Sequence, residues 1–226
     1  MAMLVNSTAK ARCVTSARVF SIKENSNQYR WEDIEIDSFP FGTFVSNGPD
    51  GSNWLANVFS GGPGGARLRT LGSDEVWLQW MAGSGGGFAQ PHIQYVRLNT
   101  ADLRLIQQSQ IWNPDIAFNY ASFSVAWERV GAVVGFGGAS DFGTPAVGIM
   151  GDGVFHAPCI SAANAGRFGD YLTVRQAWPN SRLFSAFVYC VTAGPTFNPR
   201  YVLFGRSVDV NPIPIARAFP WTTLSS

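Results

Sequence analysis

Two oxygen-bearing side chains, Asn119 and Asp170, stand at the same position in two similar segments of the chain. Each directly precedes a tyrosine, and each segment ends in Ala-Trp. If the segments form equivalent strands of adjacent sheet units, the amide and the carboxylate converge on one point. Calcium prefers carboxylate, amide and carbonyl oxygens. The pattern therefore predicts a Ca²⁺ site with Asn119 and Asp170 as ligands. The alternative is that both side chains cap turns by bonding local backbone amides.

A hydrolase at such a site needs a general base, and the chain has few candidates. It has only two histidines, His92 and His156, and imidazole titrates near neutral pH. Asp115 lies just ahead of the first of the two segments. We predict His92, Asp115 and Asp170 as catalytic residues, with the cation lowering the pKa of a bound water. For each histidine the alternative is a hydrogen-bonded structural role.

The bond to be cleaved is predicted to be an ester, a lactone or a glycosidic bond. A glycosidase needs two carboxyl groups that face each other at about 5–9.5 Å. Asp115 and Asp170 form one candidate pair across neighbouring units, and Asp74 with Glu75 forms another. The order of residues alone leaves both pairs open.

Three further residues are predicted to bind the substrate. Arg167 lies just before Asp170 and has the geometry to bind a substrate carboxylate through two hydrogen bonds. The alternative for Arg167 is an ion pair with Asp170. Tyr120 and Tyr171 occupy equivalent positions, where their rings would line a funnel for a sugar or an acyl chain. Packing between sheets is the alternative for both rings.

These residues depend on a repeated sheet unit. Segments 119–127 and 170–178 each read as a strand, and each is followed by a second strand, at 130–138 and 183–191. A unit that recurs after roughly 40–50 residues indicates a propeller or an array, because one such unit cannot bury its own faces. Four earlier strands at 66–71, 75–81, 92–98 and 103–112 form a predicted antiparallel meander.

Chain length sets the expected number of units. The predicted strands from 66 to 206 make three units, and the remaining residues suffice for about two more. No stretch has the 3.6-residue periodicity of a helix. We therefore predict an all-β fold, a five-bladed β-propeller that forms a single domain over residues 1–226. A β-sandwich is the alternative, since it also has many short strands and turns.

Composition narrows the class of partner. The chain of 226 residues is 46% hydrophobic and only 14% charged, with a net charge of +1, so it lacks the basic footprint of a nucleic-acid-binding protein. It also lacks an apolar run of the roughly 20 residues that a membrane helix needs. The three cysteines Cys13, Cys159 and Cys190 fit no zinc motif. Three structural thiols are the favoured interpretation, and one disulfide is the alternative.

The segment Arg167-Phe168-Gly169-Asp170-Tyr171 resembles the Arg-Trp-Gly-Asp-Tyr motif of secreted bacterial β-propeller proteins of the sialidase-like type. Phe168 replaces the usual tryptophan, and the resemblance extends over residues 67–191. The Ser-x-Asp-x-Gly-x-Thr-Trp box is absent, so sialidase activity is not implied. The resemblance implies a secreted or periplasmic origin, although the N-terminus does not look like a signal peptide and a cytoplasmic location is the alternative.

The size and predicted blade number also resemble those of small calcium-containing five-bladed propeller hydrolases, which include lactonases and glycosidases. That resemblance implies a calcium-dependent hydrolase with a small-molecule or carbohydrate substrate. The alternative is a non-catalytic propeller module that binds carbohydrate or protein through its eight tryptophans and its arginines.

Overall fold

The computed structural model describes residues 2–5, 13–41, 44–58, 64–164, 168–194 and 196–209. Within these ranges the regular elements are strands, apart from one 3₁₀ turn, η1 (Ser207–Asp209). The predicted all-β fold is confirmed. None of the described residues forms a helix that is long and apolar enough to cross a bilayer.

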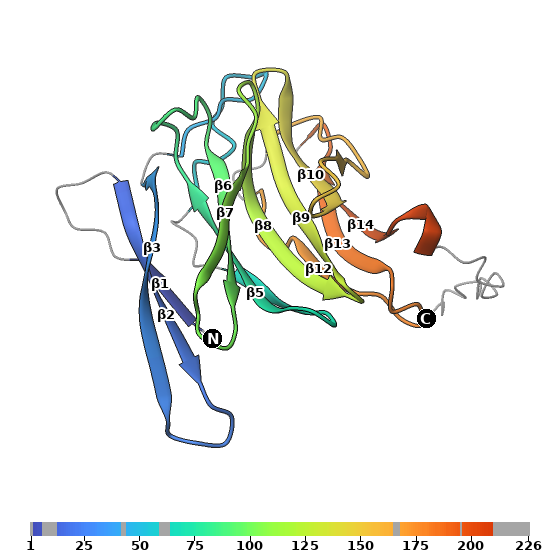
Figure 1. The fold of residues 1–226 in the computed structure, drawn as a ribbon. Coiled ribbons are helices and arrows are strands. Elements are labelled where there is room, and N and C mark those ends of the chain that lie inside the picture. Colours follow the sequence, from blue (N-terminus) through green and yellow to red (C-terminus); the bar gives the residue numbers. More distant parts are fainter. Residues whose placement is uncertain are drawn as a thin grey trace.

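Four antiparallel sheets follow one another along the chain (Figure 1). Sheet I holds β1 (Ala2–Val5), β2 (Cys13–Ile22) and β3 (Tyr29–Pro40). Sheet II holds β4 (Gly64–Arg69), β5 (Asp74–Ala82), β6 (His92–Asn99) and β7 (Leu105–Ile111). Sheet III holds β8 (Ala117–Ala126), β9 (Arg129–Gly138), β10 (Asp141–Ile149) and β11 (Phe155–His156). Sheet IV holds β12 (Thr173–Gln176), β13 (Phe184–Val191) and β14 (Phe197–Phe204). In each sheet, strands that are neighbours in sequence are hydrogen-bonded neighbours.

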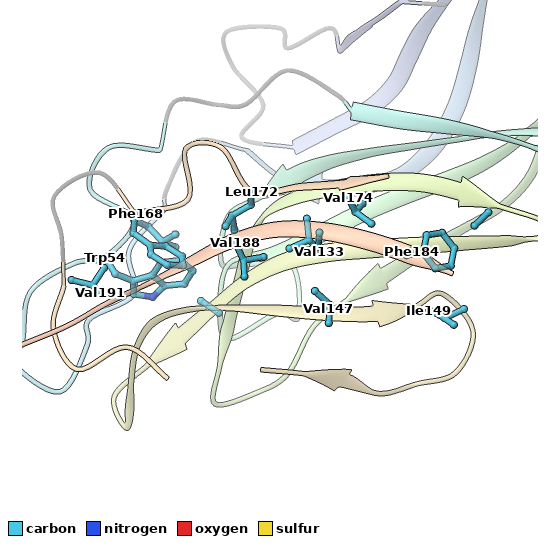
Figure 2. Packing of buried hydrophobic residues seen from close by; sticks show 14 residues of the cluster. Trp54, Val133, Val147, Ile149, Phe168, Leu172, Val174, Phe184, Val188 and Val191 are labelled. Carbon is cyan, nitrogen blue, oxygen red and sulfur yellow. The ribbon is translucent and has the colours of Figure 1, made fainter. Parts of the chain in front are cut away.

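The sheets stack face to face in the order of the chain, with one core at each contact. Sheets I and II meet through a cluster that includes Val19, Ile34, Leu78 and Val96. Sheets II and III meet through Leu68, Ile93, Ala132 and Val134, among others. Sheets III and IV meet through Val133, Val147, Val174, Phe184 and Val188 (Figure 2).

Strand β9 shows why the stacking follows from the sequence. Its alternate side chains point to opposite faces, so Ala132 and Val134 pack toward sheet II while Val133 packs toward sheet IV. A strand that is buried on both faces reads as a continuous apolar run rather than an alternating one. Strand β13 lies in an end sheet and alternates instead, with Ala186 and Val188 buried and Phe187 exposed.

Most predicted strands of sheets II to IV are confirmed, and the predicted meander matches sheet II. The strand predicted at 54–59 is wrong in its described part. There Ala56 N–H donates to the carbonyl of Asn53 and Val58 N–H to the carbonyl of Leu55, as in turns. The edge strand predicted at 39–46 is also wrong, because Phe39 and Pro40 end β3. Residues 42 and 43 of that segment lie outside the described residues.

The described residues show four stacked sheets and do not show a closed ring. The five-bladed propeller and the single-domain organisation therefore stay predictions, and the sandwich alternative is compatible with the structure. The repeat itself has a structural counterpart. Strands β8 and β12 are the first strands of sheets III and IV and contact each other. The equivalent residues Tyr120 and Tyr171 share a left-handed backbone, with φ of 53° and 76°.

The structure corrects the favoured interpretation of the cysteines. Cys159 and Cys190 form a disulfide, which joins the segment after β11 to strand β13. Hydrogen bonds also join the cross-linked segment to the end of β13, since Ala162 N–H donates to the carbonyl of Val191 at 2.7 Å and Val191 N–H donates to Oγ of Ser161 at 3.1 Å. Cys190 is buried, as its strand pattern predicts. The bond thus ties sheet III to sheet IV.

Candidate functional site

Four aromatic rings gather where β8 and the turn before β12 approach each other. Phe168 lies at the centre, with ring centroids 5.6 Å from Trp54, 6.1 Å from Tyr120 and 5.6 Å from Tyr189. Figure 2 shows Phe168 and Trp54 side by side at one end of the core between sheets III and IV. Of these rings only Tyr120 was predicted as a site residue.

Gly169, which directly precedes the exposed Asp170, packs against this aromatic cluster. Its φ is +95°, and a Cβ built on Gly169 would lie 2.2 Å from the ring of Tyr120. Its N–H donates to the hydroxyl oxygen of Tyr189 at 2.6 Å. Burial raises the pKa of both tyrosines, that of Tyr189 to about 12, and the charge of Asp170 adds to the effect. The structure therefore brings the predicted residues Tyr120 and Asp170 together.

Asn119 is fully buried beside this cluster, and its contacts match the turn-capping alternative. Its Oδ1 accepts the backbone N–H of Tyr120 at 2.8 Å. Its Nδ2 is left without a hydrogen-bond partner, as is Nε1 of Trp54. The oxygen that would ligate a cation already accepts this local N–H, so the contacts of Asn119 favour the turn-capping role over a calcium ligand. In the described ranges no three Asp, Glu, His or Cys side chains gather into a metal site. The calcium site stays a prediction, and we derive no chemistry from it.

His92 is buried in a polar network within sheet II. Nε2 of His92 accepts from Nε2 of Gln94 at 2.9 Å, so Nδ1 carries the proton and donates to the carbonyl of Gln90 at 3.3 Å. The ring stacks on Phe88 with centroids 3.9 Å apart. Burial lowers the pKa of His92 to about 4. These contacts favour the structural alternative over the predicted role as general base.

The network of His92 makes stability depend on pH. In the unfolded chain the imidazole has its ordinary pKa near 6.5, so between about pH 4 and 6.5 the unfolded chain binds a proton that the folded chain does not. The stabilisation that comes from keeping His92 neutral is therefore fully present above about pH 6.5 and is lost as the pH falls towards 4. We expect the free energy of unfolding to fall by up to about 3 kcal/mol as the pH drops to 4.

Urea denaturation between pH 4 and 7.5 measures this loss, and His92→Gln should flatten the pH profile because an amide does not titrate. His156→Gln is the matched control, since His156 is exposed on β11, and it should keep the profile of the unchanged chain. A profile that is equally steep in His92→Gln would show that another group is responsible.

The remaining predicted residues are spread over the molecule. Asp115 is exposed, and its N–H donates to Oδ1 of Asn113 at 2.9 Å in a local turn. Tyr171 is almost fully exposed, unlike its equivalent Tyr120. Arg167 lies outside the described residues. The hydrogen bonds of His92 join it to glutamines, so they do not link it to Asp115.

The other candidate carboxylate pair is held by arginines. Oδ2 of Asp74 lies 2.6 Å from Nη2 of Arg67, and Oε2 of Glu75 lies 2.8 Å from Nε of Arg97. Hydrogen bonding to Arg67 lowers the pKa of Asp74 to about 2, and hydrogen bonding to Arg97 lowers that of Glu75. Both carboxylates are ionised at neutral pH, so neither offers the proton that a glycosidase acid must donate.

A groove of about 550 Å³ opens between sheets II and III. Apolar and aromatic side chains form most of its lining, and none of the lining side chains is charged. The aromatic members are Tyr95, Trp112, Phe118, Phe136 and Phe155. The amides of Gln110 and Asn113 supply the polar side chains. Apart from Trp112, which is one of the eight tryptophans named for the alternative binding module, sequence reasoning missed these residues, because the groove forms only when two sheets stack.

The polar edge of this groove is held in place from within sheet II. Nε2 of Gln110 donates to Oε1 of Gln94 at 3.3 Å, and Gln94 is in turn fixed by His92. Trp112 is 49% exposed, with its ring set edge-on to Phe88 at 5.5 Å. The groove thus combines a partly exposed indole with a preoriented amide.

A second groove of about 490 Å³ lies between β10, β11 and β14. His156 contributes to its lining, with Asp152 and Arg206. Nε of Arg206 donates to Oδ2 of Asp152 at 3.0 Å, so the two charges neutralise each other. The aromatic groove between sheets II and III is therefore the better candidate for binding an uncharged ligand.

No protein-family model, curated protein or solved structure matches this chain. The resemblance to sialidase-like propeller proteins stays a prediction.

Proposed function

We propose that the chain is a non-catalytic carbohydrate-binding module whose site is the groove between sheets II and III. The observation that supports it is the lining: five aromatic rings and two amides, with no charged side chain. Sugars have apolar C–H faces that stack on aromatic rings. They also have hydroxyls that both donate and accept, which suits an amide because it offers a carbonyl oxygen and an NH₂ group. The volume lies in the range of small-ligand sites.

Two residues are assigned distinct roles. Trp112, half exposed at the rim, would provide the platform on which a sugar ring stacks. Gln110, held by Gln94, would hydrogen-bond a sugar hydroxyl in a fixed orientation. The buried His92 is hydrogen-bonded to Gln94, which in turn holds Gln110. His92 would therefore affect the ligand only indirectly, by helping to position Gln110.

Catalysis receives less support from the same groove. Its lining contains no carboxylate, histidine, serine or cysteine, so it offers neither an acid–base pair nor a nucleophile. The calcium-dependent hydrolase stays an untested prediction. Within the proposal, the four sheets are four of the five blades of the predicted propeller. The disulfide is in keeping with a secreted origin, since disulfides persist in oxidising compartments.

Binding to a glycan array, followed by calorimetry on the glycans retained, tests the proposal. We expect Trp112→Ala to weaken binding at least about tenfold, which corresponds to about 1.4 kcal/mol. Trp127→Ala is the matched control, because Trp127 is similarly exposed, at 53% against 49%, but lies outside the aromatic groove. Trp112→Phe should retain part of the affinity, since it keeps an aromatic face.

Two results would overturn the proposal. One is the absence of any bound glycan, and the other is equal binding by Trp112→Ala and Trp127→Ala. Turnover of generic esters, lactones or glycosides that is abolished by EDTA would instead establish the calcium-dependent hydrolase.

A further inference from the structure

The outer face of sheet IV is apolar and uncovered by the other described residues. Phe187, Tyr201 and Leu203 are 59%, 56% and 56% exposed. Phe187 and Tyr201 are directly paired across β13 and β14, with ring centroids 5.2 Å apart. Arg175 lies on the same face, because it pairs with Ser185, which in turn pairs with Leu203. The opposite face of sheet IV packs on sheet III.

The outer face of sheet I has the same character at the other end of the row. Cross-strand pairs place Phe20 opposite Trp31 and Ile22 opposite Tyr29 on this face. Trp31, Tyr29 and Ile22 are all exposed. The opposite face, with Val19 and Ile34, packs on sheet II. Figure 1 shows β2 and β3 at one end of the molecule and β13 and β14 at the other.

We propose that sheet IV of one copy packs face to face on sheet I of a second copy. Each sheet contact within the chain joins the faces of two successive sheets, and this association repeats that arrangement between chains. Both end faces carry adjacent large apolar side chains, and soluble monomers seldom expose contiguous apolar patches of this kind.

The charges on the outer faces of sheets I and IV are complementary. The face of sheet I carries the ion pair of Arg18 with Asp33 and, next along the strand, Glu35. Glu35 therefore adds an excess negative charge. The face of sheet IV carries Arg175 and no acidic side chain among its described strand residues. Opposite charges favour the pairing of IV with I, whereas IV against IV would place arginine near arginine.

The two faces are different surfaces, so the interface is heterologous. The assembly therefore keeps one unused face of sheet I at one end and one unused face of sheet IV at the other. Such contacts close into a ring if the rotation permits and otherwise extend into a filament. A mixture of two complementary variants can therefore stop the assembly at two copies.

Sedimentation velocity and light scattering of the full chain over a range of concentrations test the proposal. We expect the unchanged chain to self-associate, and Phe187→Glu and Trp31→Glu each to be monomeric. An equimolar mixture of these variants should form a 1:1 heterodimer and nothing larger, because one variant supplies an intact sheet I and the other an intact sheet IV. Leu71→Glu, at a fully exposed turn outside both faces, should associate like the unchanged chain.

A charge exchange gives an independent readout. Glu35→Arg and Arg175→Glu should each weaken association by about threefold, and the double variant should restore it. Circular dichroism confirms that every variant is folded.

Four results would overturn the proposal. A monomeric unchanged chain at high concentration is one, and association that survives both single face variants is another. If the Trp31→Glu variant still self-associates while the Phe187→Glu variant does not, the contact is instead symmetric, between two copies of sheet IV. A monomer that loses thermal stability on Phe187→Glu would indicate that residues 210–226 of the same chain cover sheet IV.

Discussion

Gly169→Ala is expected to lower the free energy of unfolding by about 3–5 kcal/mol. Two costs add together at this position. The φ of +95° lies in the left-handed region, which a residue with a Cβ rarely adopts. The new methyl group would also lie 2.2 Å from the ring of Tyr120, which itself packs on Trp54 and Phe168. The ring has little room to yield, so the turn that carries Asp170 must move.

Denaturation in guanidinium chloride measures this loss, and Gly151→Ala is its matched control. Gly151 has a similar φ of +93°, but no atom lies within 4 Å of its added Cβ. It therefore reports the backbone cost alone, about 1–2 kcal/mol. The difference between the variants isolates the steric cost, and removing the ring in a Tyr120→Ala background should cancel it. Equal losses in Gly169→Ala and Gly151→Ala would contradict the packing described around Tyr120.

Removing the disulfide is expected to cost about 3–4 kcal/mol. The bond closes a loop between residues 31 positions apart, and the entropy that it removes from the unfolded chain grows with loop length. The double variant Cys159→Ala with Cys190→Ala should therefore unfold at a lower denaturant concentration. Adding reductant to the unchanged chain should produce a similar shift.

Non-reducing peptide mapping first establishes the pairing, with one cross-linked peptide containing Cys159 and Cys190. Reductant should have no effect on the double variant, while Cys13→Ala should respond to reductant as the unchanged chain does. If peptide mapping of oxidised protein finds no such cross-link, the thiol interpretation favoured by the sequence is restored.

The strands could be predicted because their signals are local. In β6 the alternating burial of Val96 and Leu98 against Tyr95 and Arg97 follows the period of two in the sequence. The antiparallel meander predicted for the four strands between residues 66 and 112 matches sheet II. The failure at 54–58 has a physical reason: a short apolar run can also be a turn whose side chains enter a core. Trp54 and Leu55 do so between sheets III and IV.

The candidate site could be predicted only in part. The repeat aligns Asn119 with Asp170, and Tyr120 directly follows Asn119, so the repeat also placed Tyr120 near Asp170. The aromatic groove could not be found this way, because Tyr95 and Phe155 belong to different sheets and line one groove only after the sheets stack. The sequence also could not predict that His92 is buried, because a histidine can serve either as a general base in a cleft or as a neutral ring packed within a sheet.

The row of four sheets has a consequence for how the molecule unfolds. Each core joins only two successive sheets, so the coupling is between nearest neighbours, as in a linear array of repeats. Sheets II and III each share two cores, whereas sheets I and IV each share one. The ends of such an array open at a lower free energy than its middle, so fraying of the chain begins at a terminal sheet and propagates inward.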